Sequence, residues 1–393
     1  MRKKPYLSIS EPGQAMFSNW NYPTQVCVGE GRIQELPTLC EQLSIRRPLL
    51  VTDAGLAKLP FIKAISESCH DLAIQSFTEI KPNPTGTNIY AGAKAFKAGN
   101  HDAVIAIGGG SALDAGKAIA LIANQNCSLF DLEDIGDNWK NADPNKIAQT
   151  IAIPTTAGTG SEVGRAAVII DEEECKKSII FHPKMMPVQV ILDPNLTLAL
   201  PPLLTAATGM DALSHSLEAY CATNFHPMAE GIAIEGIRLV KEYLPKAVAE
   251  GNDVDARTQM LVASLMGATA FQRGLGAMHA LAHPLGAIHD AHHGMLNAIL
   301  MPYVLKANYT LINQRLKKIS PYLEIDNGFD GFLEWTIQLR CQLGIPNTLD
   351  AIIKEDINYA SIADMAVADP SASTNPILFT AKQYREILIS AHL

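Results

Sequence analysis

The sequence is short of positive charge and has no long apolar run. Its 393 residues include 31 Lys and Arg against 40 Asp and Glu, a formal net charge of −9. Without basic stretches, such a chain is poorly suited to bind a nucleic-acid backbone or an anionic membrane. The uncharged windows 194–210 and 274–289 are interrupted by Pro, Gly, Thr or His, so no membrane-spanning segment is expected. Basic residues 2–4 are followed by polar residues and Pro12, unlike the apolar core of a signal peptide.

Cysteine pairing is also absent from the pattern. The chain has seven cysteines, an odd number, and no C-x-x-C motif. Unpaired thiols are typical of a reducing compartment, whereas small secreted domains arrange their cysteines in pairs. We therefore expect a cytoplasmic protein. With 48% hydrophobic and 18% charged residues, the chain can bury a large core, which excludes wholesale disorder.

The composition changes near residue 200. Before it, short apolar runs alternate with helix-like segments, a pattern typical of βαβ units around a mostly parallel sheet. Only residues 166–192 lack an intervening helix, and we expect antiparallel hairpins there. After residue 200, Ala, Leu and Met dominate long helical blocks. The sequence thus predicts an α/β domain over residues 1–199 and an all-helical domain over residues 200–393.

The usual dinucleotide fingerprint, G-x-G-x-x-G, is missing, but another glycine turn takes its place. The apolar run 103–107 leads into residues 108–111 (GGGS) and then into a helical segment. Glycines at a strand-to-helix turn let backbone N–H groups approach a phosphate, and the helix N-terminus adds partial positive charge. Ser111 and Asp114 also match a capping pattern that would start the helix here. Taken alone, this segment fits an ordinary flexible turn as well.

Two more predicted strands end in residues suited to a nucleotide. One is followed by residues 154–161 (PTTAGTGS), which are small or carry hydroxyl groups, and the other ends at Asp53. An acidic residue after a strand binds a ribose diol and repels the 2′-phosphate of NADP, although Asp-Ala-Gly is also a common turn. Together the three strand ends predict a dinucleotide site in the α/β domain.

Five of the eleven histidines fall within one window of 15 residues in the helical half. Imidazoles need polar partners in a core, so this density indicates a metal site. His279 and His283 are four residues apart and share a helix face, as do Asp211 and His215 upstream. Each pair alone fits a structural role, but together a carboxylate and several imidazoles favour Fe(II) or Zn(II). By spacing alone, His283 and His293 qualify equally as ligands.

Motifs along nearly the whole chain resemble the iron-containing alcohol dehydrogenase family. They are GGGS-x-x-D-x-x-K at 108–117, PTTAGTGSE at 154–162, GMDALSHSLEAY at 209–220, HALAHPLG at 279–286 and HHGMLNAILMP at 292–302. The resemblance implies an α/β N-terminal dinucleotide-binding domain and an all-α C-terminal metal-binding domain, the architecture of dehydroquinate synthase-like proteins. Any one motif is unspecific, but the set is highly specific.

The resemblance also implies a role for each candidate residue. Fe(II), or alternatively Zn(II), would be bound by four side chains: Asp211, His215, His279 and His293. His283 would lie beside the substrate and help to pass the alcohol proton towards solvent. NAD would be surrounded by nine residues: Asp53, Asn83, Gly109, Gly110, Ser111, Thr155, Thr156, Thr159 and Lys177. The implied reaction is hydride transfer between a small primary alcohol or diol, in reverse an aldehyde, and NAD(H), in a homodimer.

Three other functions stay open at this point. A zinc-dependent glycerol-type polyol dehydrogenase differs mainly in metal and substrate. A dehydroquinate synthase-like lyase needs Lys and Arg around its metal, yet residues 274–301 contain neither. Metal storage without catalysis leaves the nucleotide-like strand ends unexplained. The sequence does not select the alcohol substrate, and residues 6–9 are the segment expected to pair across two subunits.

Overall fold

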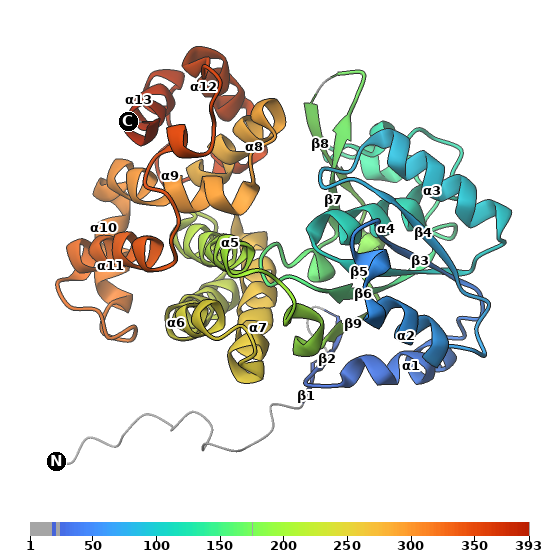
Figure 1. Cartoon of the computed structure of the whole chain (residues 1–393). Coiled ribbons are helices and arrows are strands. Elements are labelled where there is room, and N and C mark those ends of the chain that lie inside the picture. Colours follow the sequence, from blue (N-terminus) through green and yellow to red (C-terminus); the bar gives the residue numbers. More distant parts are fainter. Residues whose placement is uncertain (1–17, 21–23, 175, 393) are drawn as a thin grey trace.

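The computed structural model describes residues 18–20, 24–174 and 176–392, which form two parts (Figure 1). The first part, blue to green, is built on a seven-stranded sheet of order β1-β2-β9-β6-β5-β3-β4. Neighbouring strands are parallel except for the antiparallel pair β1–β2. The strands of this sheet are β1 (Ser18–Trp20), β2 (Gln25–Val28), β3 (Pro48–Asp53), β4 (Gln75–Ile80), β5 (Ala103–Gly108), β6 (Gln149–Pro154) and β9 (Gln189–Leu192).

Helices cover both faces of this sheet, which explains why its central strands are apolar throughout. Every residue of β5 is buried. Ile105 and Ile107 pack in one cluster with Leu36 of the helix before β3, whereas Val104 and Ala106 pack in a second cluster on the opposite face. The covering helices are α1 (Leu36–Gln42), α2 (Pro60–Ser68), α3 (Gly86–Ala98) and α4 (Gly110–Ile122). The predicted α/β domain is therefore confirmed.

Residues 166–192 form only one hairpin, which partly corrects the sequence prediction. β7 (Ala166–Asp171) and β8 (Lys176–Phe181) pair antiparallel in a separate two-stranded sheet. β9, in contrast, lies in the main sheet and is parallel to both β2 and β6. A strand after a hairpin can return to a parallel sheet without any intervening helix, so the missing helix did not predict its pairing.

The second part of the chain is helical. Nearly all of α5 is buried, because α6, α7 and α9 surround it. Aliphatic side chains of these helices form one continuous core with side chains of β2 and β9 of the main sheet. The helices are α5 (Pro202–Cys221), α6 (Pro227–Ala249), α7 (Val254–Ala270), α8 (Ala277–His289), α9 (His293–Ala307), α10 (Tyr309–Ile319), α11 (Gly328–Gln342), α12 (Tyr359–Ala368) and α13 (Ala381–His392). The predicted all-helical domain is confirmed as well.

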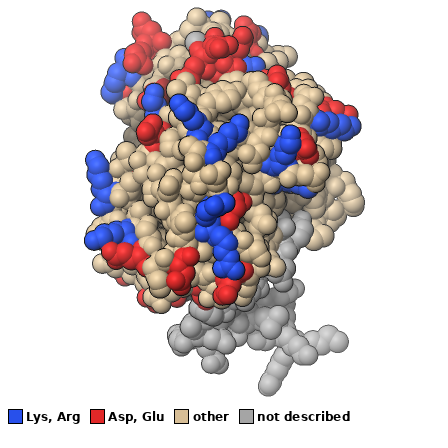
Figure 2. Space-filling view, turned by 90° about the vertical axis from the view of Figure 1, so that its right-hand side faces the viewer, with Lys and Arg blue, Asp and Glu red and all other residues tan. Residues whose placement is uncertain are grey.

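Charged side chains of both signs are intermixed on the face of the α/β part that Figure 2 shows. Such a face creates no extended field of one sign. Among the helices that the structure describes, none is both long and apolar enough to cross a bilayer.

Candidate metal and nucleotide site

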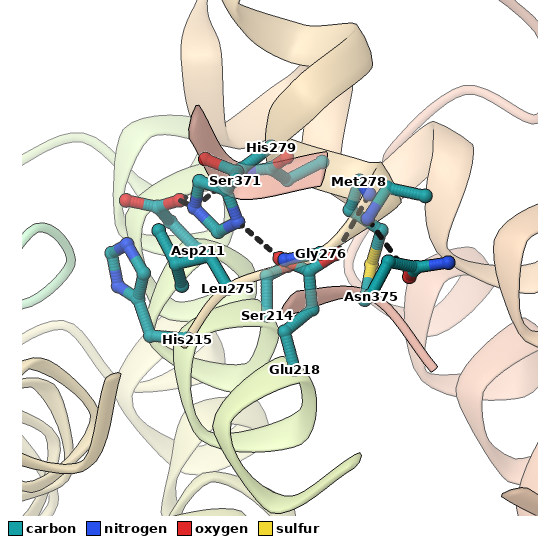
Figure 3. Close-up of polar contacts among 12 residues, drawn as sticks. Asp211, Ser214, His215, Glu218, Leu275, Gly276, Met278, His279, Ser371 and Asn375 are labelled. Atoms are coloured by element: carbon teal, nitrogen blue, oxygen red, sulfur yellow. Dashed lines mark hydrogen bonds and ion pairs between the residues drawn. The ribbon is translucent and has the colours of Figure 1, made fainter. Parts of the chain in front are cut away.

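The first candidate ligands come from one face of α5. Asp211 and His215 are one helical turn apart and are only 2% and 5% exposed. His279, near the start of α8, is 1% exposed and faces them (Figure 3). One possible ligand atom from each of these three residues lies within 4.8 Å of the other two, a spacing that a single metal ion can bridge. The structure therefore brings together two segments that lie more than 60 residues apart in sequence.

His293 begins α9 and approaches the same carboxylate. Its Nε2 lies 3.5 Å from Oδ1 of Asp211, and Nε2 of His279 lies 3.8 Å from the same oxygen. The next residue, Gly294, allows this approach: a Cβ there would lie 2.2 Å from the carbonyl oxygen of Ala207 on α5. His293 thus reaches the carboxylate of the buried group of three from α9, with a side chain that is itself 29% exposed.

The protonation states of this group suit a cation. Burial alone would raise the pKa of Asp211, but neighbouring imidazoles, that of His215 foremost, lower it to about 2. Burial lowers the pKa of His215 to about 4, and it also lowers the pKa of His293. At neutral pH the group therefore holds a buried carboxylate, and the imidazoles of His215 and His293 are neutral, which are the forms that bind a divalent metal. For His279, burial is outweighed by the carboxylate of Glu218, which raises the pKa of this imidazole. A bound cation would also compensate the buried negative charge.

Three of these histidines have a protein partner at Nδ1. Nδ1 of His215 lies 3.3 Å from the carbonyl oxygen of Gly158, and Nδ1 of His279 lies 2.6 Å from a carboxylate oxygen of Glu218. His283 pairs through Nδ1 with Asp369 at 2.8 Å, and its ring stacks on another imidazole of the group. Such partners orient imidazoles and fix which nitrogen remains free.

The geometry distinguishes two histidines that spacing had left equivalent. His293 reaches Asp211, whereas His283 pairs with Asp369 from the segment after α12. The side chain of His283 is 19% exposed and that of His293 is 29% exposed, so exposure does not separate the two. The carboxylate that each ring contacts is therefore what separates the two histidines.

On the nucleotide side, the glycine turn and the threonine loop lie against each other. A Cβ on Gly110 would lie 2.6 Å from Cγ2 of Thr159, and a Cβ on Gly109 would lie 3.4 Å from the hydroxyl of Thr156. The backbone N–H of Thr155 donates to the carbonyl of the glycine that ends β5, at 3.0 Å. The expected nucleotide residues of these two loops are thus adjacent, with little space between them.

Ser111 and Asp114 do not form the predicted cap. The N-terminus of α4 has Gly109 as its N-cap and no side-chain cap. Asp114 instead accepts hydrogen bonds from the hydroxyl of Ser161 and from the backbone N–H of Val168, and Ser111 donates to the backbone carbonyl of Pro82. Asp114 therefore ties the helix to the threonine loop, a role that a local capping motif could not reveal.

Three other expected nucleotide residues come from other segments. Oδ1 of Asp53 accepts from the N–H groups of the next turn, at 2.8 and 2.9 Å, as an ordinary Asx turn does. Asn83 donates to Oδ1 of Asp290 at 2.8 Å, across the seam between the two domains. Burial lowers the pKa of Lys177 on β8, while the same Asp290 opposes that shift. Asn83 and Lys177 therefore meet the helical domain at the turn between α8 and α9.

Sequence reasoning missed several residues of this site. Glu218 lies seven residues after Asp211, so helical periodicity could have placed it on the same face. Asn297 lies four residues after His293, and its amide nitrogen is 2.8 Å from Oδ1 of Asp211. Asp369 gave no such signal, because it comes from a distant segment.

Comparisons with known proteins agree with this architecture. The iron-containing alcohol dehydrogenase family matches residues 23–194, and the C-terminal domain of the Fe-containing alcohol dehydrogenase family matches residues 205–392. The chain is 37% identical to a 4-hydroxybutyrate dehydrogenase of Cupriavidus necator, over 93% of this chain and 98% of that protein. It is 33% identical to an NAD-dependent methanol dehydrogenase of Bacillus methanolicus, over 95% of this chain and 100% of that protein.

A solved structure gives the same result for the fold. The crystal structure of a 1,3-propanediol oxidoreductase superposes with a TM-score of 0.89 and 30% identity, covering 96% of this chain and 100% of that one. The likeness extends over both domains.

Proposed function

This chain belongs to the iron-containing alcohol dehydrogenase family, and we propose that it transfers a hydride between a small primary alcohol or diol and NAD(H), in reverse reducing the aldehyde. Relatives named for methanol, 1,3-propanediol and 4-hydroxybutyrate support this substrate class, since each of these compounds carries a primary hydroxyl group. One relative is named as NAD-dependent, which supports the cofactor.

The observation that carries the proposal is the contact between the two predicted sites. The imidazole of His215 lies against the carbonyl of Gly158, a residue of the threonine loop. A nucleotide on that loop and a cation on the histidine group would therefore lie next to each other. Metal storage alone gives no reason for this arrangement.

The metal would be held by Asp211, His215, His279 and His293, and when bound it would supply Lewis-acid polarisation of the alcohol oxygen. We propose Fe(II), with Zn(II) as the alternative, because the donor set suits both. The burial of the group excludes water, which strengthens every charge interaction within it.

His283 would move the proton that the alcohol loses. Its Nδ1 is held by Asp369, so its Nε2 is left to exchange a proton, and its partial exposure gives a route to solvent. Asp369 orients this imidazole through the hydrogen bond to Nδ1, as a carboxylate does in other histidine dyads.

NAD would lie across the glycine turn and the threonine loop. Backbone N–H groups at the start of α4 would bind the pyrophosphate, and the free oxygen of Asp53 would bind a ribose diol. The proposed nucleotide residues remain Asp53, Asn83, Gly109, Gly110, Ser111, Thr155, Thr156, Thr159 and Lys177.

The test is to purify the protein anaerobically, remove metal with a chelator, and reload Fe(II) or Zn(II) separately. NADH formation is then followed by absorbance over methanol, ethanol, 1,3-propanediol, 4-hydroxybutyrate and glycerol. We expect metal-dependent NADH formation with at least one primary alcohol. A protein that binds the metal but neither binds NADH nor turns over any of these alcohols would contradict the proposal, and a preference for glycerol with Zn(II) would favour the polyol alternative.

We also propose a cytoplasmic homodimer. Six cysteines within the described residues are free thiols, which suits a reducing compartment. β1 is an outer strand of the sheet and offers backbone groups to a second copy. Residues 6–9, the predicted pairing segment, lie outside the described residues. Light scattering coupled to size exclusion would give the mass in solution, and a monomer would contradict the dimer.

A further inference from the structure

Glu218 is a buried carboxylate without a role in the chemistry proposed so far. It lies on α5, three residues after His215, and continues the helix face that carries the candidate ligands. Its side chain is only 4% exposed. A buried carboxylate is costly unless donors surround it, so the identity of its donors indicates what it does.

Three donors reach Glu218, and all come from the start of α8. Nδ1 of His279 lies 2.6 Å from Oε2, and the backbone N–H groups of Gly276 and Met278 donate at 2.9 and 2.7 Å (Figure 3). Gly276 is needed for this approach, because a Cβ there would lie 2.9 Å from Oε1. The carboxylate therefore holds the N-terminus of α8 and the ring of His279 together.

The two nitrogens of His279 face partners of opposite kind. Nδ1 faces the carboxylate of Glu218, which accepts a hydrogen bond. Nε2 faces the amide nitrogen of Asn297 at 3.2 Å, and this amide cannot be reversed without setting its oxygen against the carboxylate of Asp211. The proton of the neutral ring therefore lies on Nδ1, and the lone pair of Nε2 points towards the ligand group.

We propose that Glu218 is a positioning residue that holds His279 in the tautomer and orientation in which Nε2 binds the metal. The inference rests on the proposed function, since it requires a metal at this site. Partners that orient ligand histidines through the second ring nitrogen contribute about 10- to 100-fold to metal affinity. Glu218 acts through His279 and does not itself face the substrate.

Glu218→Gln tests the proposal, because the amide keeps the shape but presents a donor towards another donor. Zn²⁺ affinity is measured on the metal-free protein by competition with a chromophoric chelator, independently of turnover. We expect the Kd for Zn²⁺ to rise about 10- to 100-fold. Glu218→Asp, which retains the charge, should recover part of the loss. NADH affinity, measured without metal, reports that the variant is folded.

Asp369→Asn is the matched control. It makes the same carboxylate-to-amide change beside His283, whose Nδ1 is paired in the same way at 2.8 Å. We expect its Kd for Zn²⁺ to equal that of the unmodified protein, although turnover falls. A folded Glu218→Gln protein with unchanged Zn²⁺ affinity would overturn the inference, and so would an equal loss in Asp369→Asn.

The tautomer can be read without any Glu218 variant, in case Glu218→Gln does not fold. ¹⁵N NMR of the metal-free protein, with His279 assigned through His279→Gln, should show a protonated Nδ1 and an unprotonated Nε2. The opposite tautomer would overturn the inference. If the unmodified protein binds neither Zn²⁺ nor Fe²⁺, the proposed function fails together with it, whereas metal binding that ignores Glu218 removes only this inference.

Discussion

The nucleotide side and the metal side of the site are built from different kinds of residue. On the nucleotide side, small residues such as Gly110 and Thr159 bring two loops into close contact, and backbone groups are the expected donors. On the metal side, large polar side chains such as Asp211 and His279 supply the interacting atoms. The first half should therefore be damaged by added atoms and the second by lost ones. Substitutions on either side therefore test this contrast.

The largest effect is expected from His279→Ala, which removes a candidate ligand from the metal side. Loss of Lewis-acid polarisation costs several kcal/mol of transition-state stabilisation, so kcat should fall by at least about 10³-fold. Metal content, measured by mass spectrometry after dialysis, should fall in parallel. Full activity in a metal-free His279→Ala protein would remove the metal from the mechanism.

His283→Ala should separate metal binding from proton transfer. Because this imidazole pairs with Asp369 and lies outside the ligand group, the variant should keep its metal. Its kcat should fall about 10²-fold, the usual contribution of a positioned acid or base. Loss of metal at equal protein concentration would instead assign His283 to the ligands.

Gly110→Ala adds one methyl group to the nucleotide side, where its Cβ would lie 2.6 Å from Thr159. Overpacking of this kind costs about 1–3 kcal/mol, so the KM for NAD should rise about 10- to 100-fold while metal content stays unchanged. Gly231→Ala on α6 is the control, since a Cβ there would meet no atom within 4 Å. Equal KM values in the two variants would contradict the close contact of the loops.

Asp53→Gly is expected to have the smallest effect, a change in cofactor preference. The carboxylate would no longer repel a 2′-phosphate, so kcat/KM for NADP relative to NAD should rise about tenfold. The Asx turn that Oδ1 forms would also be lost, and thermal unfolding checks that the variant is still folded. An unchanged preference would leave Asp53 as a turn residue only.

The nucleotide half was easier to predict from the sequence than the metal half. The β5 strand, its glycine turn and the threonine loop are each local in sequence, so periodicity and composition identified them. Pairing was less accessible: β4 has only two buried residues and gave no apolar run, and β9 joined the main sheet. Register and strand order depend on contacts that no local pattern encodes.

On the metal side, the spacing of the histidines identified candidate ligands but did not show which of them contact Asp211. His279 and His283 share a helix face, yet Glu218 on α5 pairs with the first ring and Asp369, 86 residues after His283, pairs with the second. Helical periodicity placed Glu218 on the same face as Asp211, but an acidic residue on a helix is commonly exposed, so the pattern did not single it out. Its burial depends on the approach of α8, which required the folded chain.

The bond between the carbonyl of Gly158 and the imidazole of His215 has a thermodynamic consequence. It joins the loop proposed to bind NAD to the helix proposed to bind the cation, so a shift of this bond when one ligand binds would change the affinity for the other. Linkage makes that change reciprocal: if the ion tightens retention of NADH, then NADH must shield the ion from chelators by the same factor. Loss of the metal ion would then also weaken NADH binding, although every side chain that contacts the nucleotide is unchanged.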